Sequence, residues 1–258
     1  MGKRRYNLLV LMWSMLLFTA IIRIPTTAFA RERTSSGTEA VTETEALTEA
    51  LSEKEQADRV AEEMYHQAEL EEPAVTGLLK SVESDQAYLE GLEYRLKTVS
   101  SLSRKLLLTA HENGVTLDEA RADIGDALRY TLIIDDSVYT EKTKETLDFL
   151  KDAGYQVTKF KNYWANDERA YQGINCNLSC PNGMVFELQF HTQDSYETKG
   201  EKTHKYYEIM RDENASDEEK EEARKKHDAL FALIPVPDGA RDMTYPEYHP
   251  EKTKGQVQ

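Results

Sequence analysis

The sequence predicts an α+β fold, in which a mixed β-sheet is flanked by helices and preceded by a helical N-terminal extension. In the first half of the chain, apolar residues recur at helical spacing. Further along, the period changes to two in Tyr130–Ile134 and Tyr155–Phe160, with an amphipathic helical stretch between them. Two more β-rich runs are separated by a Pro-Asn-Gly turn, which indicates a hairpin.

The first 30 residues have the three parts of a secretory signal peptide. Basic residues at positions 3–5 precede an apolar run over 8–22 and an Ala-Phe-Ala site at 28–30. The apolar run is shorter than the roughly 20 residues of a membrane-spanning helix, which disfavours the alternative of a single membrane anchor. We therefore expect cleavage after Ala30, a secreted protein, and no stable membrane association.

The rest of the chain divides by composition. Residues 31–55 are mainly Thr, Ser, Glu and Ala, with too little apolar surface to offset the entropy of ordering, and we expect a disordered acidic spacer. Residues 56–238 are long enough for one domain with its own core. After the helix-breaking Pro-Val-Pro at 235–237, an irregular tail is expected over 239–258.

The charge of the chain limits its partners. It has 32 Lys and Arg against 47 Asp and Glu, a net charge of −15. Such a surface repels nucleic-acid backbone and anionic lipid, which argues against a nucleic-acid partner and a peripheral membrane role. A small anionic ligand held by a local basic patch remains compatible with this charge.

Three helices are expected before the first strand. Ala57–Glu71 has helical composition, and Pro73 suits the first turn of a second long helix. A third helix is predicted over Leu102–His111, with Asn113-Gly114 as its stop signal. The apolar stripe of the second helix consists of Leu78, Leu79, Val82, Leu89 and Leu92.

Strand Tyr130–Ile134, helix Glu141–Ala153 and strand Tyr155–Phe160 imply a βαβ-like crossover. The hairpin strands are predicted over 173–180 and 184–192. Two helices then follow, over 195–212 and 216–233, the second opened by a capping box of Ser216 with Glu219.

Alternation in the hairpin separates an apolar face from a polar one. Phe186, Leu188 and Phe190 point to one side, and Glu187 and its alternate neighbours to the other. The polar side is either a binding floor or a solvated sheet face. Cys176 and Cys180, about 13 Å apart along a strand, are too distant to form a disulfide and are expected to be core-facing thiols.

Two sets of charged residues suggest nucleotide chemistry. Four cations and no acid lie between Tyr94 and His111, an arrangement that suits phosphate but also a solvated helix face. Asp126, just before a strand, and Glu187, on the polar floor, could hold Mg²⁺ together with substrate phosphates, or could be surface charges. The four cations are Arg95, Lys97, Arg104 and Lys105.

Aromatic, amide and basic groups lie close to the same floor. Tyr171 could stack on a base. Zinc ligation by His191 and His204 is disfavoured because no matching His pair or Cys cluster accompanies them. The remaining groups are Asn175, Gln189 and Lys199.

Four blocks between Tyr94 and Tyr207 resemble RelA/SpoT-type alarmone synthetases, in the order of that family. They are Arg95-x-Lys97-x-x-x-Ser101-Leu102-x-x-Lys105; Asp126-Ala-Leu-Arg129; Lys161-Asn-Tyr-Trp164 with Tyr171-Gln-Gly-Ile-Asn175; and Glu187-Leu-Gln189-Phe-His191-Thr192 with His204 and Tyr207. The resemblance implies a synthetase-like nucleotidyltransferase fold, Mg²⁺ as cofactor, ATP as donor and a purine nucleotide as acceptor.

The same resemblance implies roles for individual residues. Arg95 and Arg129 would sandwich the donor adenine, and Lys97, Ser101 and Lys105 would bind its phosphates. Asp126 and Glu187 would bind Mg²⁺, with Glu187 also acting as general base, and Tyr171 would stack on the acceptor base. The other acceptor-side residues would be Lys161, Asn175, Gln189, His191 and His204.

This sequence departs from the family pattern in two places. The spacing from Asp126 to Arg129 is three rather than five, which makes Asp123 a rival metal ligand. On the acceptor side, Gln-Gly-Ile-Asn follows Tyr171 where the family has a Ser and a His, and His191 replaces an Arg. The product of the usual synthetases is therefore not implied, and the pattern looks closer to secreted nucleotide 3′-pyrophosphokinases and to toxin-like relatives that accept adenine nucleotides. The alternatives are a secreted, non-catalytic binding module of the same fold and a delivered toxin with the same chemistry.

Overall fold

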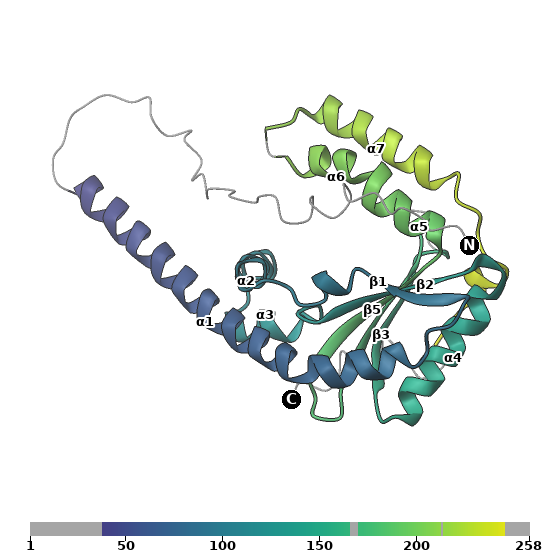
Figure 1. The fold of residues 1–258 in the computed structure, drawn as a ribbon. Helices are drawn as coiled ribbons and strands as arrows, with labels where there is room; N and C mark the ends of the chain where they lie inside the picture. Colours follow the sequence, from purple (N-terminus) through teal and green to yellow (C-terminus); the bar gives the residue numbers. More distant parts are fainter. Residues whose placement is uncertain (1–37, 166–169, 213, 246–258) are drawn as a thin grey trace. The chain divides into compact units, whose positions relative to one another are not determined.

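The computed structural model describes residues 38–165, 170–212 and 214–245, with side chains described from residue 52 (Figure 1). The chain separates into two units, residues 1–50 and 51–258. The expected signal peptide and its cleavage site lie outside the described residues. Among the helices that are described, none is long and apolar enough to cross a membrane.

Helix α1 (Thr38–Lys80) corrects two expectations. It begins inside the segment 31–55 that was expected to be disordered, because Glu and Ala are strong helix formers and a helix rich in them needs little buried surface. It also runs through Pro73, where a break was expected. Its buried residues lie on both sides of that proline, so packing holds the helix together across it. They are Ala57, Ala61, Met64, Ala68, Val75 and Leu79.

The front part of the domain is not all helix, which corrects a third expectation. Helix α1 ends at Lys80, and Leu89 lies in strand β1 (Ala87–Glu90) rather than in a helical stripe. Ala87 and Leu89 are buried while the residues between and after them are exposed. A four-residue strand is too short to show its period against the helical pattern before it.

The sheet is mixed, as predicted, with strand order β1-β2-β5-β4-β3. Strand β2 (Arg129–Ile134) pairs in parallel with β5 (Val185–His191), and the other three pairings are antiparallel. Helix α4 (Tyr139–Asp152) joins β2 to β3 (Gln156–Asn162), which confirms the crossover. The hairpin of β4 (Ile174–Ser179) and β5 lies between the two strands that α4 connects.

One face of the sheet forms the core. Phe186, Leu188 and Phe190 are fully buried, as the alternation predicted. Cys176 and Cys180 are both buried free thiols, which confirms the expectation for them. The opposite face of β4 and β5 carries the polar side chains of the site.

The remaining helices agree in part with those expected. Helix α2 (Val99–Asn113) ends at Gly114 in the left-handed conformation, and α3 (Leu117–Ala122), which was not predicted, follows. After β5, the single helix expected over 195–212 is divided into α5 (Gln193–Glu197), a π-helical turn (Thr198–Lys202) and α6 (His204–Arg211). Helix α7 (Asp217–Phe231), opened by the predicted capping box, packs along α6 (Figure 1).

The domain extends past residue 238, which corrects the expected start of the irregular tail. A short 3-10 helix (Ala240–Asp242) follows, and Ala240 and Met243 are buried. Asn162 Nδ2 donates to the carbonyl oxygens of Ala240 and Met243, at 2.7 and 3.1 Å. Helix α7 ends at Phe231, before the Pro-Val-Pro segment, and the chain after that segment contacts β3. Residues 246–258 lie outside the described part.

Candidate active site

A polar cleft lies over the hydrophilic face of β3, β4 and β5. The strand register places its side chains together, because Asn177 pairs with both Lys159 and Glu187, and Asn175 pairs with Lys161. Residues paired across neighbouring strands project from the same face. The cleft is lined by Lys105, Asp123, Gly125, Asp126, Lys159, Lys161, Tyr163, Asn175, Asn177 and Glu187.

The segment before α2 brings a second group of cations to this cleft. The backbone N–H of Lys97 donates to Ala127 O at 2.9 Å, and that of Arg129 donates to Arg95 O at 2.8 Å. Residues 95–97 therefore run beside the start of β2. Thr98 then caps α2 by accepting from the Ser101 N–H.

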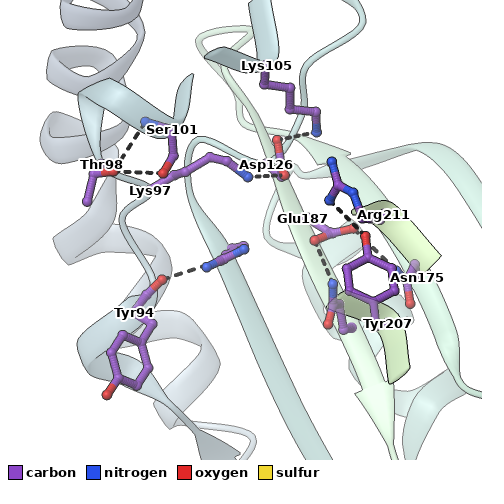
Figure 2. Close-up of polar contacts among 12 residues, drawn as sticks. Tyr94, Lys97, Thr98, Ser101, Lys105, Asp126, Asn175, Glu187, Tyr207 and Arg211 are labelled. Carbon is purple, nitrogen blue, oxygen red and sulfur yellow. Dashed lines mark hydrogen bonds and ion pairs between the residues drawn. The ribbon is translucent and has the colours of Figure 1, made fainter. Parts of the chain in front are cut away.

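Asp126 is held between two lysines of this group (Figure 2). Lys97 Nζ lies 2.8 Å from Asp126 Oδ2, and Lys105 Nζ lies 2.7 Å from Oδ1. Burial alone would raise the pKa of Asp126, but the two ammonium groups outweigh it and lower the pKa to about 2. Burial lowers the pKa of Lys97. The single carboxylate that faces this amine, Asp126, opposes the shift but does not cancel it. Asp126 is therefore ionised at neutral pH.

Glu187 is held by two amides rather than by cations. Asn175 Nδ2 donates to Glu187 Oε1 at 3.3 Å, and Gln189 Nε2 donates to Oε2 at 2.7 Å. These bonds fix the carboxylate on the polar face, and among the residues that the structure describes no cation pairs with either oxygen. Each oxygen still has a lone pair to offer a substrate or a metal ion.

A second set of contacts supports those amides from outside. The Tyr171 hydroxyl lies 2.9 Å from both Asn175 Oδ1 and His191 Nε2. Lys199 Nζ lies 2.5 Å from Gln189 Oε1 and 5.6 Å from the centre of the Tyr171 ring. A base that stacked on this face of Tyr171 would therefore compete with the ammonium group of Lys199.

His191 faces the polar side of the sheet, as predicted, but it is fully buried. Its Nδ1 lies 2.8 Å from Ser195 Oγ. Burial, together with the nearby positive charge of Lys199, lowers the pKa of His191 well below its usual value. His191 is thus a neutral structural member of the site, covered by Tyr171 and Ser195.

The two arginines expected at the donor base have different partners. Arg95 makes an ion pair with Glu72 of α1 and donates to Leu92 O. Arg129 is exposed, and its Nε lies 3.4 Å from Tyr94 O. Their main chains are hydrogen-bonded to each other, but their side chains have separate partners.

The other predicted residues are distributed as follows. Lys161 lines the cleft. Ser101 lies at the start of α2, where its Oγ accepts from Thr98 Oγ1 at 2.9 Å. His204, at the start of α6, is half-exposed, and its Nε2 lies 3.8 Å from Glu208 Oε1, outside the network around Glu187. Tyr207, on the same helix, accepts from Arg211 Nη1 at 3.0 Å.

Sequence reasoning did not assign several residues of this site, among them Lys159, Asn177 and Glu72. Lys159 and Asn177 line the cleft, and the period-two alternation with Lys161 and Asn175 could have identified them. Glu72, the partner of Arg95, has no comparable signal, because the two residues are 23 positions apart and meet only when α1 packs on the domain.

The carboxylates fit a magnesium ion that is shared with a substrate. Within the described residues, no three His, Cys, Asp or Glu side chains form a closed metal site. Mg²⁺ commonly takes one or two carboxylates and completes its shell with water and substrate phosphates. Asp126 is ionised, and ammonium groups already occupy both of its oxygens, so this position accepts positive charge. Asp123 also lines the cleft but is exposed.

Solved structures similar to this chain were found, whereas no protein-family model and no curated protein matches the sequence. One is a GTP pyrophosphokinase family protein from Streptococcus pneumoniae, with 16% identity and a TM-score of 0.46, over 66% of this chain and 86% of that one. Another is the small alarmone synthetase 1 from Bacillus subtilis bound to its product pppGpp, with 16% identity and a TM-score of 0.42, over 66% and 88%.

A third similar structure is the complex between the Type VI effector Tas1 and its immunity protein, with 18% identity and a TM-score of 0.41. It covers 66% of this chain and 95% of that one. Because the identities and TM-scores are this low, the proposed function rests on the residues of the site.

Proposed function

We propose that this chain transfers pyrophosphate from ATP to the 3′-hydroxyl of a purine nucleotide and releases AMP. The observation that carries the proposal is one cleft that joins two different carboxylates. Asp126 is held between lysines, and Glu187 is held between amides. The first arrangement suits a charged phosphate chain with its counter-ion, and the second suits a base. The motif resemblance supplies the reaction class.

The lysines at Asp126 are the proposed ligands of the donor phosphates. Lys97 lies in the segment before α2 and Lys105 lies in α2, and their ammonium groups contact the same carboxylate, that of Asp126. A triphosphate offers them stronger and more numerous acceptors than a single carboxylate does. Asp126 would then be available to Mg²⁺, which supplies charge neutralisation on the phosphates when it is bound.

Glu187 is the proposed general base. It takes the proton from the acceptor 3′-hydroxyl, whose oxygen forms a bond to the β-phosphorus of ATP. The bond between that phosphorus and the bridging oxygen of the α-phosphate breaks, and AMP leaves. Phosphoryl-type transfers depend chiefly on positioning and charge stabilisation, for which the cleft has cations on both sides.

The acceptor would lie over β3 and β4. Lys159 and Lys161 are on the same face of β3 as the amides of β4 and lie in the same cleft as Glu187. They are suited to the acceptor 5′-phosphates, while Asn175 can reach the sugar or base edge. The proposed acceptors are adenine and guanine nucleotides.

The test is an incubation of the protein with ATP, Mg²⁺ and each of AMP, ADP, GMP, GDP and GTP, followed by separation of the nucleotides. We expect AMP and a 3′-pyrophosphorylated product with at least one acceptor. If ATP stays intact with every acceptor and metal, the chain is a non-catalytic binding module. If turnover is accompanied by growth arrest of cells that express the protein without its first 30 residues, a delivered toxin is favoured.

We further propose that the protein is secreted, with cleavage after Ala30. This proposal is supported by the three-part pattern of the first 30 residues. N-terminal sequencing of the protein recovered from the culture medium should begin at Arg31. Recovery of the intact N-terminus from the membrane fraction would instead support an anchor.

A further inference from the structure

We propose that Lys199 is a positioning residue, which fixes the side-chain amide of Gln189 and through it the proposed general base Glu187. The inference rests on the proposed function and adds a residue to that site. Lys199 belongs to the π-helical turn that follows α5, whereas Gln189 and Glu187 are alternate residues of β5. Its ammonium group lies 2.5 Å from Gln189 Oε1.

The orientation of the Gln189 amide follows from what its two neighbours can do. An ammonium group has only donors, so it must meet the amide oxygen. A carboxylate has only acceptors, so Glu187 must meet the amide nitrogen, which lies 2.7 Å from Glu187 Oε2. With Lys199 on one side and Glu187 on the other, a single amide orientation satisfies both contacts. In the presence of Lys199, a flipped Gln189 amide would lose its contacts with both Lys199 and Glu187. Without the lysine, the flip would lose only the contact with Glu187.

Lys199 keeps its proton at neutral pH even though it is largely enclosed. Burial lowers the pKa of Lys199 to about 8, and Glu187 opposes this shift. The ammonium group also lies over the Tyr171 ring, 5.6 Å from its centre. The lysine is therefore held by protein groups and not by solvent alone.

The other oxygen of Glu187 is supported in the same way. Asn175 donates to it through Nδ2, so Asn175 Oδ1 faces Tyr171 and accepts the phenolic proton at 2.9 Å. The Tyr171 oxygen then accepts from His191 Nε2, and neutral His191 accepts at Nδ1 from Ser195. Ser195 Oγ has one proton and two acceptors within reach, His191 Nδ1 at 2.8 Å and Thr192 O at 3.2 Å, and it donates to the nearer one. Two outer residues, Lys199 and Tyr171, thus orient the two amides that hold Glu187.

A positioning role predicts a loss in turnover and not in substrate affinity. Changes to residues that orient ligands or bases typically cost about 10–100-fold. We expect Lys199→Met, which keeps the length of the side chain but removes its donors, to lower kcat about 10–100-fold and to leave the KM of ATP and acceptor within about twofold. Lys199→Arg should keep most of the wild-type activity, because the arginine side chain, like that of lysine, has hydrogen-bond donors and no acceptor. The matched control is Lys202→Met, an exposed lysine of the same turn.

A double-mutant cycle with Gln189→Met separates this role from direct substrate binding. If Lys199 acts through Gln189, adding Lys199→Met to Gln189→Met should change kcat by less than about twofold. Losses that multiply, or a KM that rises tenfold at unchanged kcat, would overturn the proposal. All variants are compared at equal folded fraction, and Lys199→Leu, which also has no donor, replaces Lys199→Met if the latter melts below the assay temperature.

Side-chain amide NMR of the ¹⁵N-labelled protein without nucleotide tests the proposal independently of turnover. The Gln189 NH₂ signals, assigned by their loss in Gln189→Met, should move toward the positions of an exposed glutamine in Lys199→Met and stay in place in Lys202→Met. Unchanged signals in Lys199→Met would overturn the proposal. A wild-type protein that does not turn over ATP would instead contradict the proposed function, and the NMR result would still decide the role of Lys199.

Discussion

Lys97 Nζ lies 2.8 Å from Asp126 Oδ2, although the two residues are 29 positions apart in the chain. The contact joins the segment before α2 to the loop before β2. It arises because residues 95–97 are hydrogen-bonded along the start of β2. An acidic protein thereby places two of its lysines, Lys97 and Lys105, around one ionised carboxylate. In the proposed reaction, this cluster receives the phosphates of the donor.

Asp126→Asn should lower kcat/KM about 10³-fold or more, because the carboxylate proposed to bind Mg²⁺ is lost and the two lysines keep only a neutral oxygen. Asp123→Asn is the matched control, since Asp123 lines the same cleft but is exposed. We expect it to cost less than about threefold, which is under ~1 kcal/mol of barrier. Initial rates at saturating Mg²⁺ measure both variants. A larger loss for Asp123→Asn than for Asp126→Asn would exchange their roles.

Acid should abolish the contribution of Asp126 to stability. Its folded pKa of about 2 lies below its ordinary value, so its ion pairs stabilise the fold above the unfolded pKa of about 3.9 and lose this effect as pH falls through the folded pKa. The difference in free energy of unfolding between wild type and Asp126→Asn should stay constant from pH 7 to about 5 and shrink between about pH 4 and 2.

Urea unfolding at a series of pH values measures that difference, and the other carboxyl groups cancel because both proteins contain them. A difference that grows on acidification would show that Asp126 is not stabilised by its lysines in the folded protein.

Removal of residues 239–258 should destabilise the domain, because Ala240 and Met243 are buried and Asn162 Nδ2 would lose its carbonyl partners. Burial of two such side chains and these hydrogen bonds suggests a loss of about 2–4 kcal/mol. For a domain of this size the melting temperature should fall by about 5–15 °C. The control, removal of 246–258 only, retains these contacts. Equal melting temperatures for the two truncated proteins would contradict the role of this segment.

Much of the sheet and of its polar face could be predicted from the sequence. Alternation in β5 is a local property of the sequence. It correctly separated Glu187 and Gln189 from the buried residues that alternate with them, which are Phe186, Leu188 and Phe190. Strand β1 was missed because its four residues follow a long helix and are too few to establish a period. The start of α1 was missed because low apolar content was taken to mean disorder, although Glu and Ala favour a helix without a core.

Long-range contacts of the site could not be predicted in the same way. The pairing of Lys97 with Asp126 depends on two backbone segments lying side by side, which composition and spacing do not encode. Lys199 reaches Gln189 from a π-helical turn, and such turns insert a residue into a helical stretch without a clear sequence signal. The burial of His191 depends on Tyr171 and Ser195 covering it.

Glu187→Gln should abolish transfer while the fold stays intact. The side chain lies on the polar face of β5, and an amide of nearly equal volume costs little packing there. Two functions would be lost together, the basic oxygen and the negative charge that supports Mg²⁺. General base catalysis alone typically contributes 10²–10⁴-fold, so we expect a loss on the order of 10³ or more.

The new amide would also change the hydrogen bonds of its neighbours. Glu187 accepts from Asn175 and Gln189, and a glutamine at this position could accept at one site only, so one neighbouring amide would have to turn. Glu62→Gln, the same change on an exposed position of α1, is the control. Single-turnover AMP release and thermal melting measure activity and fold. A Glu187→Gln protein that melts normally and retains a tenth of the wild-type rate would remove Glu187 from the mechanism, because neither the base nor the metal ligand can be dispensed with at so small a cost.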